Sequence, residues 1–410
     1  MTHVAVLGAG ITGVTTAYAL SKQGYQVTVI DRHRYPAMET SFANGGQLSA
    51  SNAEVWNSTA TILKGLKWMA RRDAPLLLNP APTWHKYSWL AEFVWNIGRY
   101  RSNTVETTRL AISARQHLFR MAIDEGINFD LEKRGILHFY FDKPSFDSAS
   151  KSNQLLVEGG LERYAVSKQE IHDIEPALRG DYHGGFFTPS DATGDIHKFT
   201  RGLALACERR GVTFMLDTSV DKLDANDAGV DIQWSHADGE QVERGRTHVD
   251  AIVVCAGVGS RHFAQELGDR INIYPVKGYS ITVHLDDEQS RAGAPFVSLL
   301  DERAKIVTSR LGADRFRIAG TAEFNGVDRD IRNDRIAPLV SWVRKNFDLN
   351  TSRAVPWAGL RPMTPSMMPR VGPGKRKGVF YNTGHGHLGW TLSAATAEMV
   401  TQSVAGQLAA

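Results

Sequence analysis

The chain of 410 residues is long enough for two or three structural units of about 150 residues each. Its composition, 42% hydrophobic and 22% charged, is that of an ordinary folded protein and excludes a small disulfide-stapled scaffold. The 47 basic and 44 acidic side chains leave a formal net charge of only +3, so the sequence predicts no nucleic-acid partner.

The two cysteines, Cys207 and Cys255, lie far apart in the sequence and match no metal-ligand spacing. They predict a reduced protein without a metal site. The N-terminus has no basic region before its short apolar stretch, which argues against a cleaved secretory signal. No apolar run approaches the roughly 20 residues of a membrane-spanning helix. We therefore expect a cytoplasmic protein, either soluble or peripheral on the inner face of the cell membrane.

The first 31 residues predict a strand, a tight turn, a helix and a second strand, which together form one βαβ unit. The strands are HVAVLG at 3–8 and QVTVID at 26–31, and the helix is expected over 14–24. Between the first strand and the helix lies Gly8-Ala9-Gly10-Ile11-Thr12-Gly13, a fingerprint that lets a pyrophosphate approach the backbone at a helix N-terminus. Asp31 ends the second strand and can accept a hydrogen bond from a ribose hydroxyl.

The loop after the second strand decides between two dinucleotides, because the glycine fingerprint alone fits both FAD and NAD. Thr40 and Ser41 can donate to a pyrophosphate, and Gly45-Gly46 leave room for a flat ring. These features favour FAD. The candidate FAD-binding residues of this N-terminal region are Gly8, Gly10, Ile11, Thr12, Gly13, Asp31, Arg32, Thr40, Ser41, Asn44, Gly45 and Gln47.

The rest of the chain mixes helices with strands that alternate like antiparallel ones. Helices are expected at 104–125, 197–210, 334–347 and 391–407. Strands are expected at 135–142, 214–217, 230–234, 250–257, 279–285, 296–300, 305–309 and 315–320.

This pattern predicts an α/β fold with two domains, each discontinuous in the sequence. A Rossmann-like FAD-binding domain of the glutathione-reductase type is expected, together with a mostly antiparallel α+β substrate domain and a ligand cleft between them. The FAD-binding domain takes 1–50, 190–262 and 350–410, and the substrate domain takes 51–189 and 263–349.

Six blocks in one order carry a resemblance that runs nearly end to end. They are ETSFANGGQLS at 39–49, KGLKWMARRDAPL at 64–76, TGDIHKFTRGLA at 193–204, YPVKGYSIT at 274–282, WAGLRPMTP at 357–365 and NTGHGHLGWT at 382–391. The sequence resembles the small-subunit group of D-amino acid dehydrogenases, within the superfamily of D-amino acid oxidase and glycine oxidase.

The resemblance implies FAD-dependent oxidation of a D-amino acid to an imino acid, which water hydrolyses to a 2-oxo acid and ammonia. Hydride would pass from Cα to flavin N5, and electrons would leave to a quinone or another respiratory acceptor. Two related activities remain open: an oxidase of the glycine oxidase type that uses oxygen, and a dehydrogenase of a cyclic amino acid such as D-hydroxyproline. A third alternative is a cofactor-bound subunit that docks to a membrane or complex without turnover of its own. The oligomeric state stays open.

The candidate catalytic residues are Arg361, Tyr279, Asn44 and His385. Arg361 matches the arginine that binds the substrate carboxylate in the superfamily, and its planar fork suits two parallel hydrogen bonds. Tyr279 either contacts the same carboxylate or is an ordinary buried strand tyrosine. Asn44 either faces the pocket or forms an Asx turn beside two glycines. We find no obvious strong general base.

The glycine-rich segment that begins at Gly384 is expected to place backbone N–H groups and a helix N-terminus against the flavin. Its candidate flavin-binding residues are Gly384, Gly386, Leu388, Gly389, Trp390 and Thr391. His385 and His387 lack cysteine or acidic partners, so we reject a zinc site there. Three further positions match the superfamily's adenine and pyrophosphate contacts: Val220, Ala256 and Gly257.

One segment departs from the family pattern, and another allows two interpretations. The family commonly has aspartate and glycine where this chain has Ser366-Met367, followed by Met368, and we expect this change beside the pocket to affect the substrate. The Trp-rich basic segment 64–100 interleaves basic side chains with apolar ones. With Lys64, Lys67, Arg71 and Arg72 among Leu66, Trp68 and Met69, it can lie on anionic lipid, or it can be an ordinary helix with one solvated face.

Overall fold

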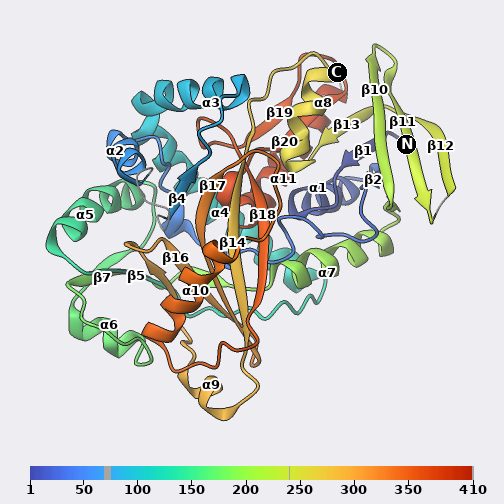
Figure 1. Ribbon diagram of the computed structural model, residues 1–410. Helices are drawn as coiled ribbons and strands as arrows, with labels where there is room; N and C mark the ends of the chain where they lie inside the picture. Colours follow the sequence, from blue (N-terminus) through green and yellow to red (C-terminus); the bar gives the residue numbers. More distant parts are fainter. Residues whose placement is uncertain (69–74, 240, 409–410) are drawn as a thin grey trace.

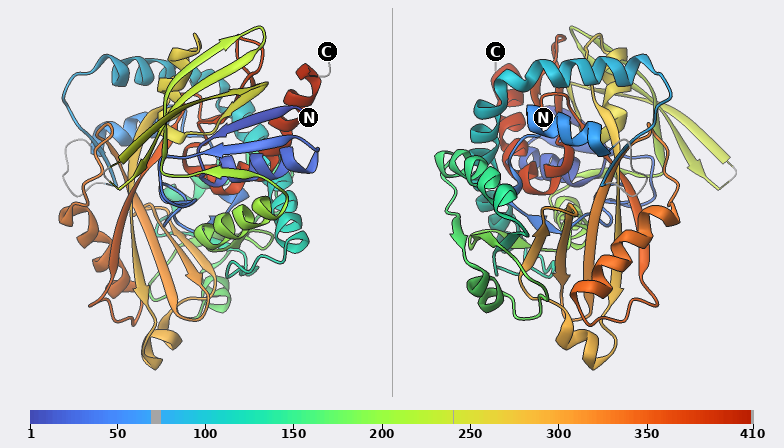
Figure 2. Two further views of the ribbon diagram at one scale, coloured as in Figure 1. Left: turned by 90° about the vertical axis from the view of Figure 1, so that its right-hand side faces the viewer. Right: turned by 60° about the vertical axis from the view of Figure 1, so that its left-hand side comes forward.

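The computed structural model describes residues 1–68, 75–239 and 241–408. Two large sheets organise these residues: a mostly parallel sheet of six strands and a mostly antiparallel sheet of nine. Figure 2 shows the nine-stranded sheet below the six-stranded one in its left view. The predicted α/β architecture with a parallel nucleotide-binding sheet and a second, antiparallel unit is confirmed.

The six-stranded sheet begins with the predicted βαβ unit, in which β1 pairs in parallel with β2 on one side and with β13 on the other. These strands are buried on both faces, which explains their continuous apolar runs. In sheet order the strands are β19 (Arg370–Pro373), β20 (Val379–Thr383), β13 (Ala251–Val254), β1 (His3–Leu7), β2 (Gln26–Ile30) and β9 (Thr213–Met215).

Helices rich in small side chains cover one face of this sheet, and α1 packs against both α11 and α7. Their bounds are α1 (Ile11–Lys22), α4 (Tyr100–Asp124), α7 (Ile196–Arg209) and α11 (Gly389–Leu408). A three-stranded antiparallel sheet covers the other face, where its apolar side chains form a core with β1, β13 and β20. It consists of β10 (Thr218–Asn226), β11 (Gly229–Asp238) and β12 (Gln241–Val249). We predicted part of β11 and missed β10 and β12.

The nine-stranded sheet contains the antiparallel strands that alternation predicted. Its order is β18 (Val355–Met363), β14 (Tyr274–His284), β17 (Arg315–Phe324), β16 (Ile306–Leu311), β15 (Ser298–Asp301), β5 (Ile136–Tyr140), β7 (Gly184–Thr188) and β6 (Tyr164–Val166), with β4 (Leu76–Leu78) beside β17. Around it lie α5 (Lys143–Glu158), α6 (Lys168–Ile174), α9 (Glu288–Gly293) and α10 (Asn333–Asn346), whereas α8 (Ser260–Glu266) packs beside β10 and the six-stranded sheet.

β18 differs from our expectation, because we placed 350–410 in the FAD-binding domain. Its residues pair with β14 along their whole length, from Val355 opposite Thr282 to Met363 opposite Tyr274. The sheet to which β18 belongs is therefore the nine-stranded one, and the chain returns to the six-stranded sheet only at β19. A short two-stranded ladder of β3 (Gln47–Leu48) and β8 (Ala192–Thr193) also holds the loop after β2 in place.

The Trp-rich segment contains α2 (Thr59–Trp68) and α3 (Trp84–Trp95), with α3 on the outside of the molecule (Figure 1). α3 buries Trp89 and Phe93, and the Trp89 indole donates to the Met363 carbonyl. Of the basic and apolar residues that suggested a lipid-binding stretch, Met69, Arg71 and Arg72 lie outside the described residues. In the described part of the chain, no helix is long and apolar enough to cross a membrane.

Candidate active site

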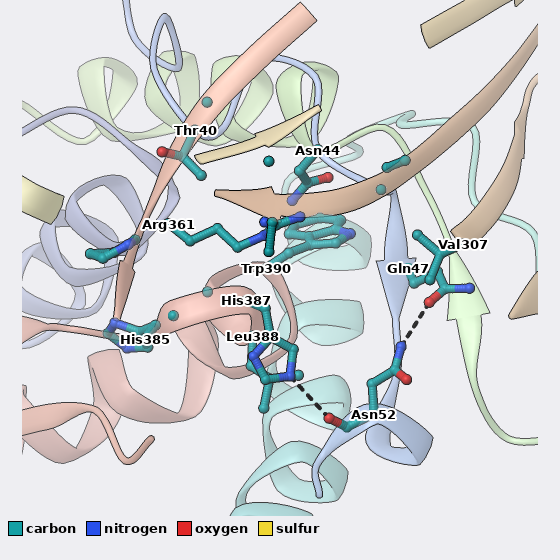
Figure 3. A pocket seen from close by; sticks show the side chains of 18 of the residues that line it. Thr40, Asn44, Gln47, Asn52, Val307, Arg361, His385, His387, Leu388 and Trp390 are labelled. Carbon is teal, nitrogen blue, oxygen red and sulfur yellow. Dashed lines mark hydrogen bonds between the residues drawn. The ribbon is translucent and has the colours of Figure 1, made fainter. Parts of the chain in front are cut away.

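A cavity of about 1940 Å³ is lined by residues of both large sheets and of the loops between them. It brings together every candidate residue proposed from the sequence except Gly13 and Thr391. Figure 3 shows part of it, with Arg361 reaching in from β18 and with His385, His387 and Trp390 on the opposite loop and helix. The loops after β1 and β2 form one side of the cavity, and β14, β17 and β18 form another.

The turn after β1 has the shape that a pyrophosphate needs. Gly8 adopts a φ of 107°, and a Cβ there would lie 2.8 Å from the Cys255 carbonyl oxygen. Gly13 lies behind the turn, where a Cβ would overlap the Gly8 oxygen at 1.8 Å, so its part is to let α1 pack on β1. Gly10 is open, with only the Ser41 hydroxyl near its Cβ position. The residues present therefore fit a dinucleotide whose diphosphate lies at the N-terminus of α1.

Two polar side chains hold this turn by bonding to its N–H groups. Asp31 accepts from the Ala9 N–H at 2.6 Å and from the His33 N–H at 2.8 Å. Ser41 accepts from the Ile11 N–H at 3.0 Å and keeps its own hydroxyl proton for another acceptor. We predicted that Asp31 binds a ribose and that Ser41 binds a pyrophosphate. The structure adds a role for both side chains in shaping the turn.

The remaining candidates of the loop after β2 mostly bond to protein. Arg32 pairs with Glu39 at 2.6 Å, Thr40 donates to the Leu360 carbonyl, and the Gln47 amide donates to Ser298. Gly45 and Gly46 line the cavity, and their part in leaving room for a flat ring stays a prediction. A Cβ on Gly45 would lie 2.8 Å from Val307 and one on Gly46 would lie 3.0 Å from Ser309, so these glycines let the loop pack on β16.

Arg361 projects from β18 into the cavity without a carboxylate partner among the described residues. Its guanidinium crosses Gly278 of the neighbouring strand so closely that a Cβ there would lie 2.3 Å from its atoms. One N–H donates to the Thr321 carbonyl at 3.2 Å. Burial by the cavity walls lowers the pKa of Arg361 to about 10, which leaves it a cation at neutral pH. An unpaired, desolvated arginine is prepared for an anionic ligand.

Tyr279 and its neighbours form a buried ionic network beside Arg361. The Tyr279 hydroxyl donates to Glu323 at 2.7 Å, and burial, with a further contribution from Glu323, raises the pKa of the phenol to about 12. Fully buried Lys277 lies 3.2 Å from Glu323 and 2.7 Å from Asp328. Tyr279 lines the cavity while its proton is directed to Glu323, and its role at a substrate carboxylate stays a prediction.

Asn44 makes the Asx turn that was the alternative to a pocket role. Its Oδ1 accepts from the Gly46 N–H at 2.9 Å, and its own carbonyl accepts from Arg317. Asn44 also lines the cavity, so its amide N–H₂ group remains available there.

The two histidines of the glycine-rich loop point in different directions. His385 is buried with Nε2 at 2.9 Å from the Thr396 hydroxyl of α11, and burial lowers its pKa to about 3. This bond ties the glycine-rich loop to α11, and because His385 also lines the cavity, its catalytic role stays a prediction. His387, which we considered only as a metal ligand, has its ring on the cavity with Nε2 at 3.2 Å from the Asn52 carbonyl.

The spacing of the two histidines is the one sequence feature that could have indicated different partners, since residues two apart in an irregular loop can face opposite ways. The other candidates of the loop divide between the cavity wall and the interior. Gly384, Gly386, Leu388, Gly389 and Trp390 line the cavity, whereas Thr391 is buried and accepts from the Ser49 N–H. Val220, Ala256 and Gly257 line the cavity near the turn after β13. No group of three or more metal-binding side chains gathers within residues 1–68, 75–239 and 241–408.

The segment Ser366-Met367-Met368 does not line the cavity, contrary to our expectation. The Ser366 carbonyl accepts from Asn103 of α4, and the Met368 sulfur accepts from Thr107 of the same helix. Met367 adopts a φ of 64°, a conformation that favours glycine and explains why the family pattern has glycine there. The change therefore affects packing on α4 rather than the cavity wall.

Comparisons with known proteins agree with this geometry. Residues 3–403 match the DAO family model, described as FAD dependent oxidoreductase. The chain is 62% identical to D-amino acid dehydrogenase 3 of Mesorhizobium japonicum, over all of this chain and 98% of that one. It is 40% identical to D-amino acid dehydrogenase of Paramagnetospirillum magneticum, over 98% of this chain and 95% of that one.

Two solved structures share the fold at low sequence identity. Glycine oxidase from Geobacillus kaustophilus superposes with a TM-score of 0.76 at 17% identity, over 99% of this chain and 96% of that one. L-proline dehydrogenase from P. horikoshii superposes with a TM-score of 0.73 at 15% identity, over 99% of this chain and 94% of that one. With a family model covering nearly all its residues and relatives aligned end to end, this chain belongs to the DAO family of FAD-dependent oxidoreductases.

Proposed function

We propose that this enzyme oxidises the α-amino group of a D-amino acid. The product is an imino acid, which reacts with water to give a 2-oxo acid and ammonia, and the electrons pass to a quinone or another respiratory acceptor. The names of the end-to-end relatives support the substrate class. The cofactor that receives the electrons from the substrate is FAD, as in the family.

The observation that carries this proposal is the unpaired Arg361 in the cavity. A desolvated guanidinium with no carboxylate partner in the described chain suits a ligand that brings its own carboxylate. The Thr321 carbonyl and the flat surface of Gly278 fix the plane of its fork, so a carboxylate can bind through two parallel hydrogen bonds.

Positioning accounts for most of what the side chains contribute. FAD, when bound, supplies the acceptor for the hydride that leaves Cα. Arg361 fixes one end of the amino acid, and beside it the Lys277–Glu323 ion pair and the hydrogen bond from Tyr279 to Glu323 link β14 to β17. Because the amine lone pair assists departure of the hydride, a strong general base is not required once the amine is neutral.

The reaction class is tested by an anaerobic titration of the FAD-loaded protein. A panel of D- and L-amino acids, including glycine and both enantiomers of proline and hydroxyproline, is added while the flavin absorbance is recorded. We expect several D-amino acids to bleach the flavin and their L-enantiomers to leave it oxidised. Bleaching only by L-amino acids, or by none of the panel, would contradict the proposal.

The electron acceptor needs a separate measurement. The reduced protein is mixed with a soluble quinone or with air-saturated buffer, and recovery of the oxidised spectrum is followed together with peroxide. We expect the quinone to reoxidise the protein faster. Rapid peroxide formation would favour an oxidase of the glycine oxidase type instead.

We also propose that α3 holds the enzyme on the membrane surface, where a quinone is found. Trp84 and Trp95 are each 84% exposed, and they share one helix face with exposed Tyr87 and Val94. Tryptophan and tyrosine rings favour the boundary between lipid and water. In sedimentation with anionic vesicles, we expect Trp84→Ser with Trp95→Ser to abolish binding without changing turnover with a soluble quinone. Equal sedimentation of both proteins would rule out this face.

A further inference from the structure

Glu54 lines the cavity with one carboxylate oxygen in use and one free. Its Oε1 accepts from the Tyr100 hydroxyl and, at 2.9 Å, from the Ser152 hydroxyl, and both donors line the same cavity. In the described part of the chain, Oε2 has no hydrogen-bond donor and no cation within ion-pairing distance, and this half-buried side chain leaves it accessible. Glu54 is therefore an anchored carboxylate that presents a free acceptor.

Asn52, two residues earlier, presents a second free acceptor. The Leu299 carbonyl can only accept a hydrogen bond, so the amide nitrogen of Gln47, 3.3 Å away, is the atom that faces it. The Gln47 amide oxygen then accepts from the Asn52 amide nitrogen at 2.9 Å. This arrangement leaves Asn52 Oδ1 accessible and without a donor among the described residues. Asn52 and Glu54 thus place two oxygens that can only accept on one stretch of the cavity wall.

The loop that contains His387 packs on β18 next to Arg361. A Cβ on Gly386 would lie 2.8 Å from the sulfur of Met363, which is two residues along β18 from Arg361. His387, the next residue of the loop, is therefore held close to the strand that carries the arginine.

His387 in turn holds the wall that carries the two free acceptors. Its ring stacks on Trp56 with centroids 4.7 Å apart, and its Nε2 lies 3.2 Å from the Asn52 carbonyl oxygen. Figure 3 shows the Arg361 side chain and Asn52 lining one pocket, with the His387 ring between them. A ligand whose carboxylate binds Arg361 can thus extend toward Asn52 and Glu54.

The charge of Glu54 is not balanced by the cations around it. Cations that line the cavity on α4, α5 and the neighbouring strands have contacts of their own, except for the exposed Lys151: Lys305 with Glu302, Arg101 with Glu158, Arg163 with Asn153 and Arg303 with the Phe141 ring. A partly buried carboxylate without a cation favours a ligand that brings one. An ammonium group brings a positive charge and three N–H donors for the two acceptors.

We propose that Glu54 and Asn52 bind the cationic end of the substrate's side chain, so that the enzyme prefers D-amino acids with a side-chain amine. The substrate then spans the cavity from Arg361, which holds its carboxylate, to Glu54, which holds the distant ammonium. This inference rests on the proposed function, because it needs an amino acid held by Arg361. Tyr100 and Ser152 are positioning residues, since they hold Glu54 through its other oxygen.

Three D-amino acids of equal chain length separate charge from hydrogen bonding. D-Ornithine ends in an ammonium group, D-norleucine has a methyl group in its place, and D-2-amino-5-hydroxypentanoic acid has a neutral donor there. Each is mixed rapidly and anaerobically with the FAD-loaded protein, and flavin reduction gives its Kd and its limiting rate. We expect the Kd of D-ornithine to be at least about tenfold below that of D-norleucine, with the hydroxyl compound between them. A Kd for either neutral compound equal to that of D-ornithine would overturn the proposal.

Glu54→Gln removes the charge and leaves the anchor. Because Tyr100 and Ser152 donate to Oε1, the glutamine oxygen takes that place and its N–H₂ group replaces Oε2. We expect the Kd of D-ornithine to rise about tenfold and that of D-norleucine to change by less than about twofold. The control Glu158→Gln removes an equal charge from α5 outside the cavity wall and should leave both values unchanged. Equal changes for the two substrates in Glu54→Gln would show a merely structural role and overturn the proposal.

Glu54→Asp keeps the charge and draws the carboxylate back by one methylene. The preference should therefore shift toward a longer amine, and we expect the ratio of Kd for D-lysine to Kd for D-ornithine to fall at least about threefold below the wild-type ratio. This variant tests the proposal by itself if Glu54→Gln does not fold, and an unchanged ratio in it would overturn the proposal.

The same titrations separate this inference from the proposed function. If no D-amino acid reduces the wild-type flavin, the proposed function and this inference both fail. If D-norleucine reduces it and binds as tightly as D-ornithine, only this inference fails.

Discussion

On its nucleotide side the cavity presents glycines and backbone N–H groups, whereas on its substrate side it presents charged side chains on adjacent strands. At Gly8 and Gly10 the chain itself makes the binding surface, and Asp31 and Ser41 hold its shape. On β14, β17 and β18 the binding group is the Arg361 side chain, held between Gly278 and a network of paired charges. A local motif can encode the first kind of site, but the second requires strands that are distant in the sequence.

The ionic network should be the most sensitive part of the substrate side. Lys277→Met leaves Glu323 and Asp328 without their buried cation, and we expect it to lower the free energy of unfolding by about 3–5 kcal/mol. Urea denaturation of the FAD-loaded protein measures this. The control Lys143→Met removes an exposed lysine paired with Asp147 and should cost less than about 0.5 kcal/mol. Equal losses of unfolding free energy in the two variants would show that the buried network stabilises the protein no more than an exposed ion pair does.

On the nucleotide side, Gly13→Ala should break the turn through packing alone. The new Cβ would collide with the Gly8 oxygen, so α1 must move away from β1, and we expect a loss of about 3 kcal/mol together with most of the bound FAD. FAD content after gel filtration and thermal unfolding are the readouts. Gly406→Ala in α11, where no atom lies within 4 Å of the new Cβ, is the matched control and should retain FAD. Normal FAD content in Gly13→Ala would contradict this account of the turn.

The pH dependence of stability tests the buried histidine on the nucleotide side. The pKa of His385 is lowered to about 3 in the folded protein, so between that value and about 6.5 the unfolded chain binds an extra proton. Its contribution is full above pH 6.5 and declines as the pH falls. At pH 5 we expect wild-type stability to have dropped by about 2 kcal/mol more than that of His385→Gln. The same pH dependence in both proteins, measured by urea unfolding at pH 7 and pH 5, would mean that His385 is not held neutral.

Gly278→Ala should have a smaller effect, which is confined to binding of the substrate. A Cβ at Gly278 displaces the Arg361 guanidinium, and we expect FAD content to be unchanged and the KM for the amino acid to rise about tenfold. In the Arg361→Ala background the same change should have almost no further effect, because the group it displaces is absent. Additive losses in this double-mutant cycle would show that Gly278 acts through another residue.

The comparison also explains what the sequence could predict. The two strands of the βαβ unit were predicted to within one residue, because its glycines, apolar runs and Asp31 are close in the chain, although the helix begins at Ile11 rather than at 14. The alternating strands 279–285 and 315–320 were found, but no strand was predicted at β18, whose pairing with β14 spans some eighty residues of sequence. β10 and β12 were missed because their exposed, polar faces hide the alternation.

Within the site, the sequence selected candidates of which most line the cavity, but it could not give their orientations. Arg361 could be selected from its motif, yet the role of Gly278 under its guanidinium depends on strand register. His385 and His387 look equivalent in NTGHGHLGWT and both line the cavity, and only the structure shows that one bonds to Thr396 and the other to the Asn52 carbonyl. Tyr279 was left open between two roles because its partner Glu323 lies on another strand.

The central claim is that Arg361 holds the substrate carboxylate, and kinetics of Arg361→Ala and Arg361→Lys test it most directly. With FAD content equal to wild type, we expect the alanine variant to lose about 2–5 kcal/mol of transition-state binding in kcat/KM, and lysine to recover only part of it because it lacks the planar fork. A near-normal kcat/KM in FAD-loaded Arg361→Ala would contradict the account and assign the carboxylate to another cation.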